Sequence, residues 1–330
     1  MKKILILGGT QFIGRNLVEK LLEENKYDLT LYNRQRTGLD LFPELRKIKG
    51  DREKREFGPL TDEHWDVVVD LSAYYPDSLS MLLKELKGKA GRYIFISTIS
   101  VYDLRRENAG MLTEDMETMP CSMEERANTE MKTYGQRKAE CERVILNEEK
   151  LDKIILRPSL VYGKYDHTDR FYYWMYRVRH CAKFILPDGG KMRMNLTNVN
   201  DLCSMILQAM EAPEHGFICN AATHEPLSLA TMIGILGEQI GTRPELVNMP
   251  GEMLSENNIR TSMDIPLWFK IDLEVSLEKA IRALGMKFTP FRESVKELAA
   301  HFEKNKWHLP KAGMSLEKET ALMGSSGKAN

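Results

Sequence analysis

The sequence predicts an α/β fold with a doubly wound parallel sheet covered by helices on both faces. In the first half of the chain, short apolar runs alternate with stretches of helical periodicity; the runs are Ile4–Leu7, Leu29–Tyr32, Asp66–Leu71, Tyr93–Ser97 and Ile154–Leu156. Strands that alternate with helices form parallel sheets, because each crossover lays a helix on one face. A glycine-rich turn directly after the first run supports the same fold, since such a turn joins its first strand and helix.

Helices are expected in the intervals between these strands. In the first half they are Ile13–Leu22, Ser78–Leu86 and a long one around Tyr134–Ile145. Later, the pattern predicts a helix at Asn198–Glu211, a strand at Gly216–Asn220, and helices at Ser228–Ile240, Leu277–Leu284 and Phe291–Phe302. Ser228 is a suitable N-cap, and Gly241 and Gly285 are suitable stops.

The composition of the chain changes after Gly163: residues 164–195 are rich in aromatic residues, Arg and Lys, which suggests two lobes. We expect a Rossmann-type nucleotide-binding domain over residues 1–163 plus about 196–222. A smaller C-terminal α/β lobe for the substrate is expected over about 164–195 and 223–303. From residue 304 to residue 330 the chain is polar and ends in glycines and serines, so we expect a mobile tail there.

Composition excludes several classes of protein. The 330 residues are 42% hydrophobic and 29% charged, with a formal net charge of −1. Nucleic-acid binders usually carry a basic stripe, so we expect a small-molecule substrate and no nucleic acid. No run approaches the ~18 apolar residues of a membrane span. The apolar run after Met1 ends at Gly8, which is too short for a signal peptide, so we expect a buried first strand there.

The five cysteines are scattered and form no CxxC pair. A disulfide framework or a zinc site requires closer, patterned spacing. We therefore expect buried free thiols in a reducing cytoplasm, and no metal site.

The turn Gly8–Gly14 follows a predicted strand and opens a predicted helix. Gly8 permits the tight turn, Gly14 allows the helix to approach the strand, and the helix N-terminus offers N–H groups to a pyrophosphate. The residues of the turn expected at the cofactor are Gly8, Thr10, Gln11, Phe12, Ile13 and Gly14. Gln11 stands where a Gly-x-x-Gly-x-x-Gly pattern has glycine, so its side chain must point away from the phosphates or contact them.

The second strand ends at Asn33 and Arg34, with Arg36 two residues later. An acidic residue about 20 positions beyond the turn binds the ribose 2′-hydroxyl of NAD. Here the carboxylate is missing and guanidinium groups follow, which favours the 2′-phosphate of NADP. We therefore expect NADP in preference to NAD, unless Arg34 and Arg36 are solvated loop residues.

Tyr134 and Lys138 form a Tyr-x-x-x-Lys pair on a predicted helix. Residues four apart lie on one helical face, so the phenol and the ammonium can reach the same cleft. Alone, such a pair is also common on solvated helix faces. Upstream, the strand ending at Ser97 leads into Thr98, which places a hydroxyl at the carboxyl edge of the sheet, where open α/β sheets bind ligands.

Taken together, these features resemble the extended, atypical short-chain dehydrogenases/reductases, and within them the NAD-dependent epimerase/dehydratase family. The likeness runs from Met1 to about Phe302. It is carried by the turn Gly8–Gly14, by Gly50-Asp51-Arg52, by Ser97–Tyr102, by Tyr134 with Lys138, and by Leu156–Gly163.

The resemblance implies that Tyr134 is the general acid/base and that Lys138 lowers its pKa and binds the nicotinamide ribose. Thr98 would hydrogen-bond the substrate oxygen that starts as, or becomes, a carbonyl. A free Tyr has a pKa of about 10, so a neighbouring ammonium is needed to bring it toward neutrality. Further cofactor contacts are expected from Asp51, which would approach the adenine, and from Arg52, Leu71, Ser72, Ala73, Pro158 and Leu160, while Tyr74 and Ser100 would contact substrate.

Some positions depart from the family's better-known members. Sugar-nucleotide 4,6-dehydratases carry Asp-Glu directly after the catalytic Thr, whereas this chain has Ile99 and Ser100. Many epimerases carry an Asn where this chain has Leu160, and the usual diphosphate-binding Arg aligns with Met194, beside Arg193. We therefore expect hydride transfer on an alcohol or ketone of a sugar-like or other polar small molecule, without water elimination. Relatives often form helix-mediated homodimers, and the sequence leaves the oligomeric state open.

The segment Tyr165–Arg179 is dense in arginines and aromatic residues. Arg170 and Arg177 could grip an anionic or polyhydroxyl ligand, with Tyr173 or Trp174 stacking against it. The alternative is an amphipathic helix that packs its aromatic side chains into the smaller lobe.

Two other classes of function stay open. The glycine turn and the Tyr-Asn-Arg strand end also resemble chloroplast stem-loop-binding proteins, which would make this chain an RNA-binding protein. A third interpretation is a non-catalytic NAD(P) sensor. The near-zero net charge and the intact set of Thr98, Tyr134 and Lys138 favour the enzyme.

Overall fold

In the computed structural model, which describes residues 1–104 and 110–326, seven strands form one parallel sheet. The strand order is β11-β6-β5-β4-β1-β2-β3. The strands are β1 (Lys2–Leu7), β2 (Tyr27–Asn33), β3 (Arg46–Lys49), β4 (Trp65–Asp70), β5 (Ala90–Ile96), β6 (Asp152–Pro158) and β11 (Phe217–Ala221), and each neighbouring pair is parallel. The predicted doubly wound α/β fold is therefore confirmed.

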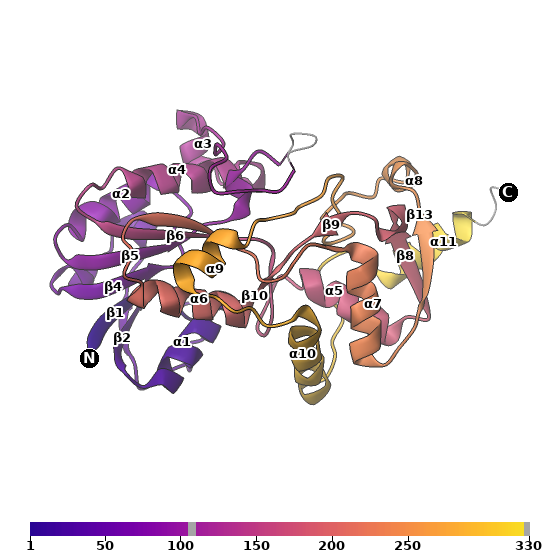
Figure 1. Ribbon diagram of the computed structural model, residues 1–330, viewed down its shortest axis with the longest axis horizontal. Coiled ribbons are helices and arrows are strands. Elements are labelled where there is room, and N and C mark those ends of the chain that lie inside the picture. The colour runs from indigo at the N-terminus through magenta and orange to yellow at the C-terminus, as the bar shows by residue number, and fades with distance from the viewer. Residues whose placement is uncertain (105–109, 327–330) are drawn as a thin grey trace. The chain divides into compact units, whose positions relative to one another are not determined.

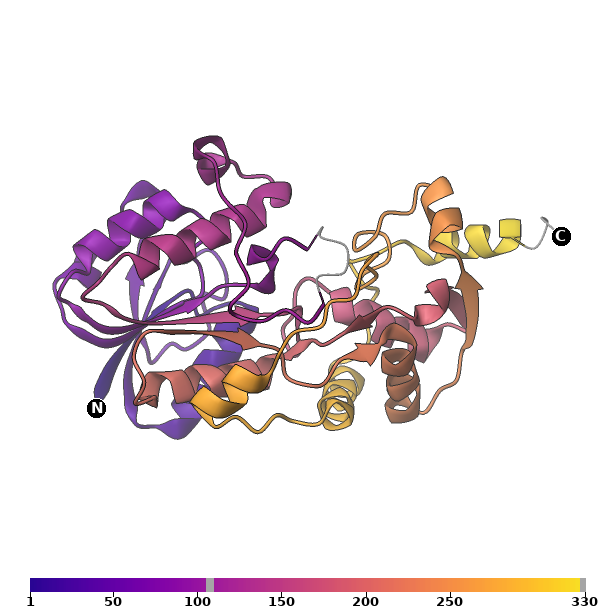
Figure 2. The same ribbon diagram turned by 45° about the horizontal axis from the view of Figure 1, so that its top comes forward.

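Helices cover both faces of this sheet. α2 (Pro76–Glu85) and α4 (Tyr134–Leu146) pack together on one face, and α1 (Phe12–Glu24) and α6 (Val199–Glu211) on the other (Figures 1 and 2). The chain changes face between β1 and β4, which are neighbours in the sheet. The carboxyl ends of these two strands therefore form the topological switch point, where open α/β sheets bind ligands.

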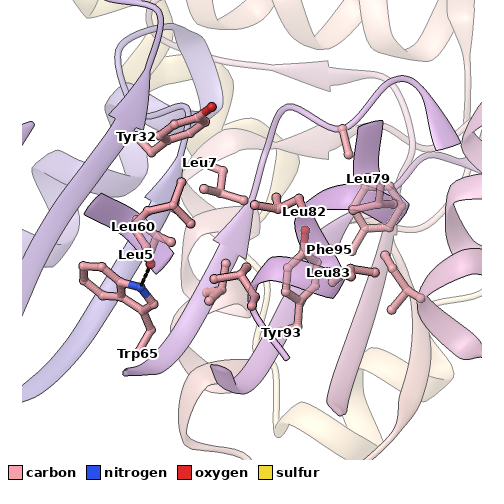
Figure 3. Packing of buried hydrophobic residues seen from close by; sticks show 14 of the residues in the cluster. Leu5, Leu7, Tyr32, Leu60, Trp65, Leu79, Leu82, Leu83, Tyr93 and Phe95 are labelled. Atoms are coloured by element: carbon pink, nitrogen blue, oxygen red, sulfur yellow. Dashed lines mark hydrogen bonds between the residues drawn. The ribbon is translucent and has the colours of Figure 1, made fainter. Parts of the chain in front are cut away.

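The core between the sheet and α2 is apolar and almost completely buried. Side chains of β1, β4 and β5 meet leucines of α2 in this cluster; Figure 3 labels Leu5, Leu7, Tyr32, Leu60, Trp65, Leu79, Leu82, Leu83, Tyr93 and Phe95. The indole of Trp65 donates a hydrogen bond of 2.8 Å to the carbonyl of Leu60, so its polar atom is satisfied inside the core. Burial on both faces explains why these strands read as continuous apolar runs.

The edge strand β3 was not predicted. Its sequence is Arg-Lys-Ile-Lys, and only Ile48 is buried. Lysine and arginine on an edge strand discourage pairing with another chain. They also leave β3 without the apolar run that is typical of a buried strand.

The chain divides into two compact units. The first comprises residues 1–161, 197–223 and 276–287, and the second comprises residues 162–196, 224–275 and the described part of 288–330. Besides the elements above, the first holds α3 (Met123–Ala127), β10 (Thr197–Asn198), α9 (Glu278–Leu284) and the short helices η1 (Arg52–Lys54), η2 (Gly58–Thr61), η3 (Ile99–Val101) and η4 (Met131–Thr133). β7 (Val161–Tyr162) spans the boundary, and the second unit holds α5 (Arg170–His180), β8 (Lys183–Pro187), η5 (Asp188–Gly190), β9 (Arg193–Met194), β12 (Leu227–Ser228), α7 (Leu229–Ile240), β13 (Glu245–Met249), α8 (Gly251–Glu256), α10 (Phe291–Asn305) and α11 (Leu316–Ser326).

Two segments differ from the expected division. The sequence pattern places α9 in the smaller lobe, but α9 packs on β11 and α6 of the first unit, where Ala280 and Leu284 are buried. The expected tail after residue 304 instead contains α11, whose Glu319 is buried against Arg177. An ion pair compensates each buried charge, so a polar segment can dock without an apolar stripe. Residues 327–330 of the expected tail lie outside the described residues.

Candidate functional site

The glycine turn lies at the switch point, directly after β1. The Gly8 N–H donates to the carbonyl of Tyr32 at 2.9 Å, and Gly8 has a φ of 121°, which L side chains rarely adopt. A Cβ on Gly14 would lie 2.7 Å from the backbone of Gly9, so α1 begins in direct contact with the turn. These two positions require glycine, as the sequence predicted.

The N-terminus of α1, directly after the glycine turn, has features that suit an anion. Its N-cap, Gln11, makes no side-chain capping hydrogen bond, and the first turn contains no acidic residue. The first N–H groups of a helix and the positive end of its dipole attract negative charge. Gln11 is exposed, Phe12 is buried with a φ of 29°, and the hydroxyl of Thr10 lies 3.5 Å from that of Thr37.

Asn33 at the end of β2 is engaged in holding the turn. Its side-chain amide donates to the carbonyl of Gly8 at 3.3 Å, and its Oδ1 accepts from the N–H of Gln35 at 2.9 Å. Asn33 therefore positions the turn, while Arg34 and Arg36 are exposed beside it.

Arg52, expected at the cofactor, is buried and held by hydrogen bonds within the protein. Its guanidinium binds both oxygens of Asp70, at 2.8 and 3.0 Å, and donates to Ser72 Oγ at 3.3 Å. Tyr93 also donates to Asp70, at 2.5 Å. Burial alone would raise the pKa of Asp70, but the Arg52 charge and these hydrogen bonds hold it below its ordinary value. Asp51, next to Arg52, is half-buried and accepts from the N–H of Glu53.

The segment after β4 forms a wall beside the turn. The Leu71 side chain lies 3.4 Å from where a Cβ on Gly8 would be, and the Leu71 N–H donates to the carbonyl of Leu7. Ala73 is buried, whereas Tyr74 is 47% exposed. Among the residues of this segment predicted to contact cofactor or substrate, Leu71 to Tyr74, the Tyr74 side chain is the most exposed.

The hydroxyls after β5 and the first turn of α4 lie close together. Thr98 caps η3; its Oγ1 accepts from the N–H of Ser100 at 3.1 Å and donates to Ser100 Oγ at 3.2 Å. A Cβ on Gly135 would lie 2.1 Å from the carbonyl oxygen of Ser100, so only glycine allows α4 to begin there. Gly135 therefore brings the first turn of α4, which begins at Tyr134, against the backbone of Ser100, a role that the sequence pattern did not indicate.

Lys138 is buried, and neutral groups surround its ammonium. Nζ donates to the carbonyls of Ala73 and Ile96, at 3.0 and 2.8 Å, and lies 3.9 Å from the ring centre of Phe95. It also lies 5.7 Å from the ring centre of Tyr74, which is itself 6.2 Å from the ring centre of Tyr134. Burial lowers the pKa of Lys138 to about 8.

The low pKa of Lys138 makes a measurable prediction. Because the pKa falls from 10.5 in the unfolded chain to about 8 in the folded one, the unfolded chain binds more protons between these values. The free energy of unfolding should therefore rise by about 3 kcal/mol between pH 8 and 10.5 relative to Lys138→Met. Urea unfolding at a series of pH values measures this difference. Lys84→Met, on the exposed surface of α2, should show the wild-type slope; an identical slope in Lys138→Met would contradict the prediction.

Glu142 of α4 and Arg157 of β6 form a buried ion pair that the sequence pattern did not indicate. Glu142, one helical turn after Lys138, accepts from Ser97 Oγ at 2.5 Å and from Arg157 Nη2 at 2.6 Å. Arg157 also donates to the hydroxyl of Tyr102 at 2.8 Å. The pair ties α4 to the ends of β5 and β6. Its only sequence signal is the spacing of Glu142 from Lys138.

The two remaining cofactor candidates lie where β6 ends. Pro158 is the last residue of β6 and is buried. Leu160 is half-buried, and its carbonyl accepts from the N–H of Thr197 at 3.0 Å. Both positions lie at the carboxyl edge of the sheet.

In the second unit, the aromatic segment proves to be mainly core. Trp174 is 1% exposed and donates to the carbonyl of Pro266 at 2.8 Å, so it is not available to stack on a ligand. Tyr173 is likewise buried, with the Arg177 guanidinium 3.6 Å from its ring centre. Arg177 is paired with Glu319, which corrects its expected role as a ligand-gripping residue.

The other two arginines predicted at the substrate have local partners. Arg170 is half-buried and donates to Thr168 Oγ1 at 3.2 Å. Arg193 is exposed and pairs with Glu274 at 2.5 Å. A substrate that binds Arg193 must therefore compete with a carboxylate already in contact.

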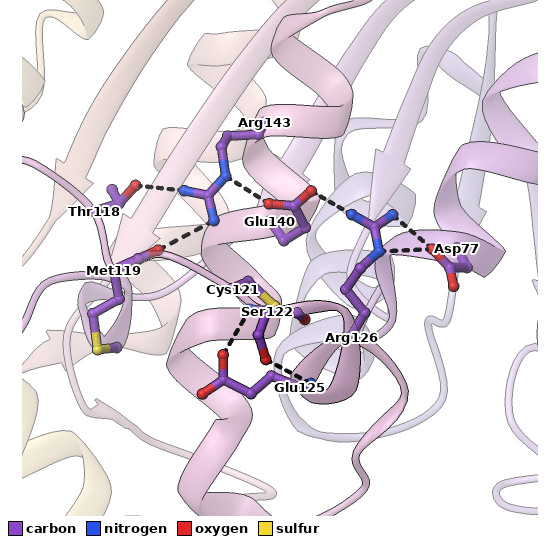
Figure 4. A network of polar contacts seen from close by, with 9 residues as sticks. All are labelled: Asp77, Thr118, Met119, Cys121, Ser122, Glu125, Arg126, Glu140 and Arg143. Atoms are coloured by element: carbon purple, nitrogen blue, oxygen red, sulfur yellow. Dashed lines mark hydrogen bonds and ion pairs between the residues drawn. The ribbon is translucent and has the colours of Figure 1, made fainter.

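A polar network fastens the segment before α4 onto the helices (Figure 4). Arg126 of α3 pairs with Asp77 of α2 at 2.6 Å and with Glu140 of α4. Arg143 donates to Glu140 at 2.6 Å and to the carbonyl of Met119 at 3.1 Å. A cavity of about 220 Å³ lies beside this network, lined by Asp103, Glu117, Thr118, Met119, Pro120, Glu125 and Gln136. These lining residues include none of the predicted site residues.

The described part of the chain offers neither a membrane-spanning helix nor a cluster of metal ligands. None of the helices there is long and apolar enough to cross a membrane. No group of three or more histidine, cysteine, aspartate or glutamate side chains gathers there as metal ligands. All five cysteines are free thiols.

A parallel sheet with a glycine turn and a helix N-terminus at its switch point defines the class of dinucleotide-binding α/β domains. The family model for the NAD dependent epimerase/dehydratase family matches residues 4–222. The chain therefore belongs to this family, as its resemblance predicted.

Three similar proteins illustrate the range of relatives. A chloroplast stem-loop binding protein of 41 kDa from Arabidopsis thaliana is 25% identical over 224 residues, which are 63% of this chain and 55% of that protein. The chain thus matches about half the length of this curated relative. A UDP-glucuronic acid 4-epimerase from Bacillus cereus in complex with NAD is 20% identical, with a TM-score of 0.70 over 92% of this chain and 100% of that one. A dTDP-glucose 4,6-dehydratase from Bacillus anthracis in complex with NAD is 18% identical, with a TM-score of 0.71 over 93% and 98%. At these identities the solved structures establish the fold.

Proposed function

We propose that this protein is an NAD(P)-dependent epimerase or oxidoreductase that acts by hydride transfer on an alcohol or ketone of a polar small molecule. The observation that carries the proposal is the close approach of α4 to the carboxyl edge of the sheet: Gly135, directly after Tyr134, meets the carbonyl of Ser100, and Lys138 donates to the carbonyls of Ala73 and Ile96. The family membership and the NAD complexes of structurally similar proteins point the same way.

The residues at the switch point fit a nicotinamide dinucleotide. The N-terminus of α1, whose N-cap Gln11 makes no side-chain capping hydrogen bond and whose first turn holds no acidic residue, suits a pyrophosphate. Gly8 and Gly14 leave room where a Cβ would intrude. Leu71, Ser72 and Ala73 would line one side, and Asp51 would lie toward the adenine. When bound, the dinucleotide supplies or accepts the hydride.

Three side chains would carry the proton chemistry. Tyr134 would exchange a proton with the reacting oxygen. Thr98 would hold that oxygen through its hydroxyl, which in the structure donates to Ser100 Oγ. Lys138 would favour the phenolate of Tyr134 by its charge. Its ammonium is surrounded by carbonyls and aromatic rings, which leaves that charge uncompensated by a contacting carboxylate.

Reaction type within the family depends on the two residues directly after Thr98. Water elimination needs an acid and a base at the sugar, and Ile99 and Ser100 offer no ionisable group there. We therefore propose redox or epimerisation chemistry. The substrate class is an alcohol or ketone of a sugar-like or other polar small molecule.

Arg34 should decide the choice between the two dinucleotides. It is exposed beside Asn33, whose amide is held by Gly8, so no carboxylate at that position competes with a 2′-phosphate. Arg34→Ala should weaken NADP binding about tenfold while changing NAD binding by less than about twofold. Titration calorimetry with both dinucleotides measures this. The exposed Arg46 of β3, changed to Ala, serves as the control, and equal losses for NADP and NAD in Arg34→Ala would refute the preference.

A direct test of the proposed function has two steps. Titration calorimetry should detect binding of NADP or NAD to the purified protein. Incubation with a panel of nucleotide sugars and simpler sugars should then give an epimer detected by NMR or a change in the absorbance of the nicotinamide. Failure to bind either dinucleotide would reject the proposal, while binding without turnover on any candidate would favour a sensor.

A second candidate is RNA binding, favoured by the similarity to the chloroplast stem-loop binding protein. Phosphate-driven binding weakens steeply with salt, by a factor that grows with the number of phosphates contacted. A stem-loop RNA titrated at low and high salt distinguishes the candidates. Tight, salt-dependent binding that NADP does not displace would support the RNA-binding function.

A further inference from the structure

Arg52 stands out because all the contacts of its guanidinium are internal to the protein. The side chain is 5% exposed, and it holds Asp70 with two parallel hydrogen bonds and Ser72 with a third. Asp70 is completely buried. The Arg52 guanidinium is therefore used for contacts within the protein, and a ligand would have to break a buried ion pair to bind it.

The backbone around Arg52 forms a compact turn. A Cβ on Gly50 would lie 2.1 Å from the carbonyl oxygen of Glu56, to which the Tyr32 hydroxyl donates at 3.1 Å. On the other side, Ser78 of α2 donates to the carboxylate of Glu53 at 2.8 Å. This turn, residues 50–56, also carries Asp51.

Ser72 lies in the wall after β4, and that wall is held from its other end by α4. Lys138 donates to the carbonyl of Ala73, and Arg137 donates to that of Tyr74 at 3.4 Å while its guanidinium lies 4.8 Å from the ring centre of Tyr75. Consecutive residues of α4 thus bind consecutive carbonyls of the wall. Arg52 joins the same wall to the turn of residues 50–56.

We propose that Arg52 is a positioning residue for the dinucleotide: through Asp70 and Ser72 it locks the turn that carries Asp51 to the wall Leu71–Tyr75, so that the adenosine side and the nicotinamide side of the site keep a fixed spacing. The inference rests on the proposed function, since it needs a dinucleotide at the switch point. It changes the role expected of Arg52 from contact to support. A bidentate guanidinium is required, because a lysine ammonium cannot bind both carboxylate oxygens and Ser72 in one plane.

The matched control is a second buried arginine that pairs with an aspartate of the sheet. Arg92 of β5 is 7% exposed and pairs with Asp152 at 2.7 Å. Asp152 begins β6 and Asp70 ends β4, so the two pairs lie at opposite edges of the sheet. Arg92 also donates to the carbonyls of Ala209 and Ala212 at the end of α6. Arg92→Lys should therefore cost stability without touching the site.

The experiment compares wild type, Arg52→Lys, Asp70→Asn and Arg92→Lys. Calorimetry gives the affinities for NADP, NAD and ADP-ribose, and thermal unfolding gives the stability of each variant. Arg52→Lys and Asp70→Asn should weaken the full dinucleotides and ADP-ribose by at least about tenfold, while Arg92→Lys with a similar loss of stability keeps wild-type affinity. The double variant Arg52→Lys/Asp70→Asn should lose no more than about either single variant, as expected of one coupled unit.

Three outcomes would overturn the inference. Equal affinity losses in Arg52→Lys and Arg92→Lys would mean that destabilisation alone weakens binding. Unchanged affinity in Arg52→Lys and in Asp70→Asn would mean that the turn and the wall keep their places without the pair. Absence of dinucleotide binding in the wild type is the separate result that rejects the proposed function and this inference with it.

Discussion

Tyr134→Phe is expected to lower turnover on an identified substrate by a factor of about 10²–10⁴, the usual contribution of general acid/base catalysis. Phe retains the ring that packs near Tyr74, 6.2 Å between ring centres, and removes only the hydroxyl. Dinucleotide affinity should change by less than about twofold, because the hydroxyl acts on the reacting oxygen. The absorbance of the nicotinamide under steady-state conditions gives turnover, and calorimetry gives the affinity.

Tyr75→Phe is the matched control for this variant. Tyr75 is half-buried in the neighbouring wall, and it contacts Arg137 through its ring face, which Phe retains. Turnover in Tyr75→Phe should stay close to wild type. Full activity in Tyr134→Phe would remove Tyr134 from the mechanism, and equal losses in both variants would show that packing rather than proton transfer is affected.

The fold could be predicted because its strongest signals are local. Buried strands such as Ile4–Leu7 are continuous apolar runs, and the glycine turn has a geometry that few sequences satisfy. Ser228 and Gly241 cap α7 as predicted; the Ser228 hydroxyl accepts from the N–H of Thr231, and Gly241 has a φ of 78°. Each of these features depends on neighbours within one or two turns of chain.

The parts that were missed depend on distant partners. β3 is stabilised by pairing with β2, and α9 finds its partners on β11 and α6. For Arg52, Gly50-Asp51-Arg52 marked a cofactor segment, but nothing in the sequence indicates that Asp70, 18 residues away, takes up the guanidinium. A local sequence pattern can predict that a polar residue lies near a site. Which residue it pairs with depends on the order of the strands in the sheet, which brings distant segments together.

The same limit explains the aromatic segment of α5. Its spacing fits both a ligand wall and an amphipathic core helix, and burial decides for the core at Trp174 and Tyr173. Arg177 is the clearest case, because a buried arginine requires a counter-ion, and that counter-ion comes from the polar segment expected to be mobile.

Glu319→Ala should therefore have a large effect on stability. Glu319 is 2% exposed; its Oε2 pairs with Arg177 Nε at 2.8 Å, and its Oε1 accepts from the N–H of Ile185 at 3.0 Å. Arg177 also donates to the carbonyl of Met314. Removing the carboxylate leaves a buried guanidinium without its counter-ion and an N–H without its acceptor, which costs about 3–5 kcal/mol. Urea unfolding measures this loss.

Hydrogen exchange over residues 306–326 separates local from global effects. If α11 undocks in Glu319→Ala and lets water reach Arg177, the amides of α11 should exchange much faster than in wild type. The loss in unfolding free energy then cannot exceed the free energy of undocking α11. Glu303→Ala is the control, because the Glu303 pair with Arg179 is exposed and such pairs contribute little. Wild-type stability together with wild-type exchange in Glu319→Ala would mean that α11 is not fastened by this ion pair.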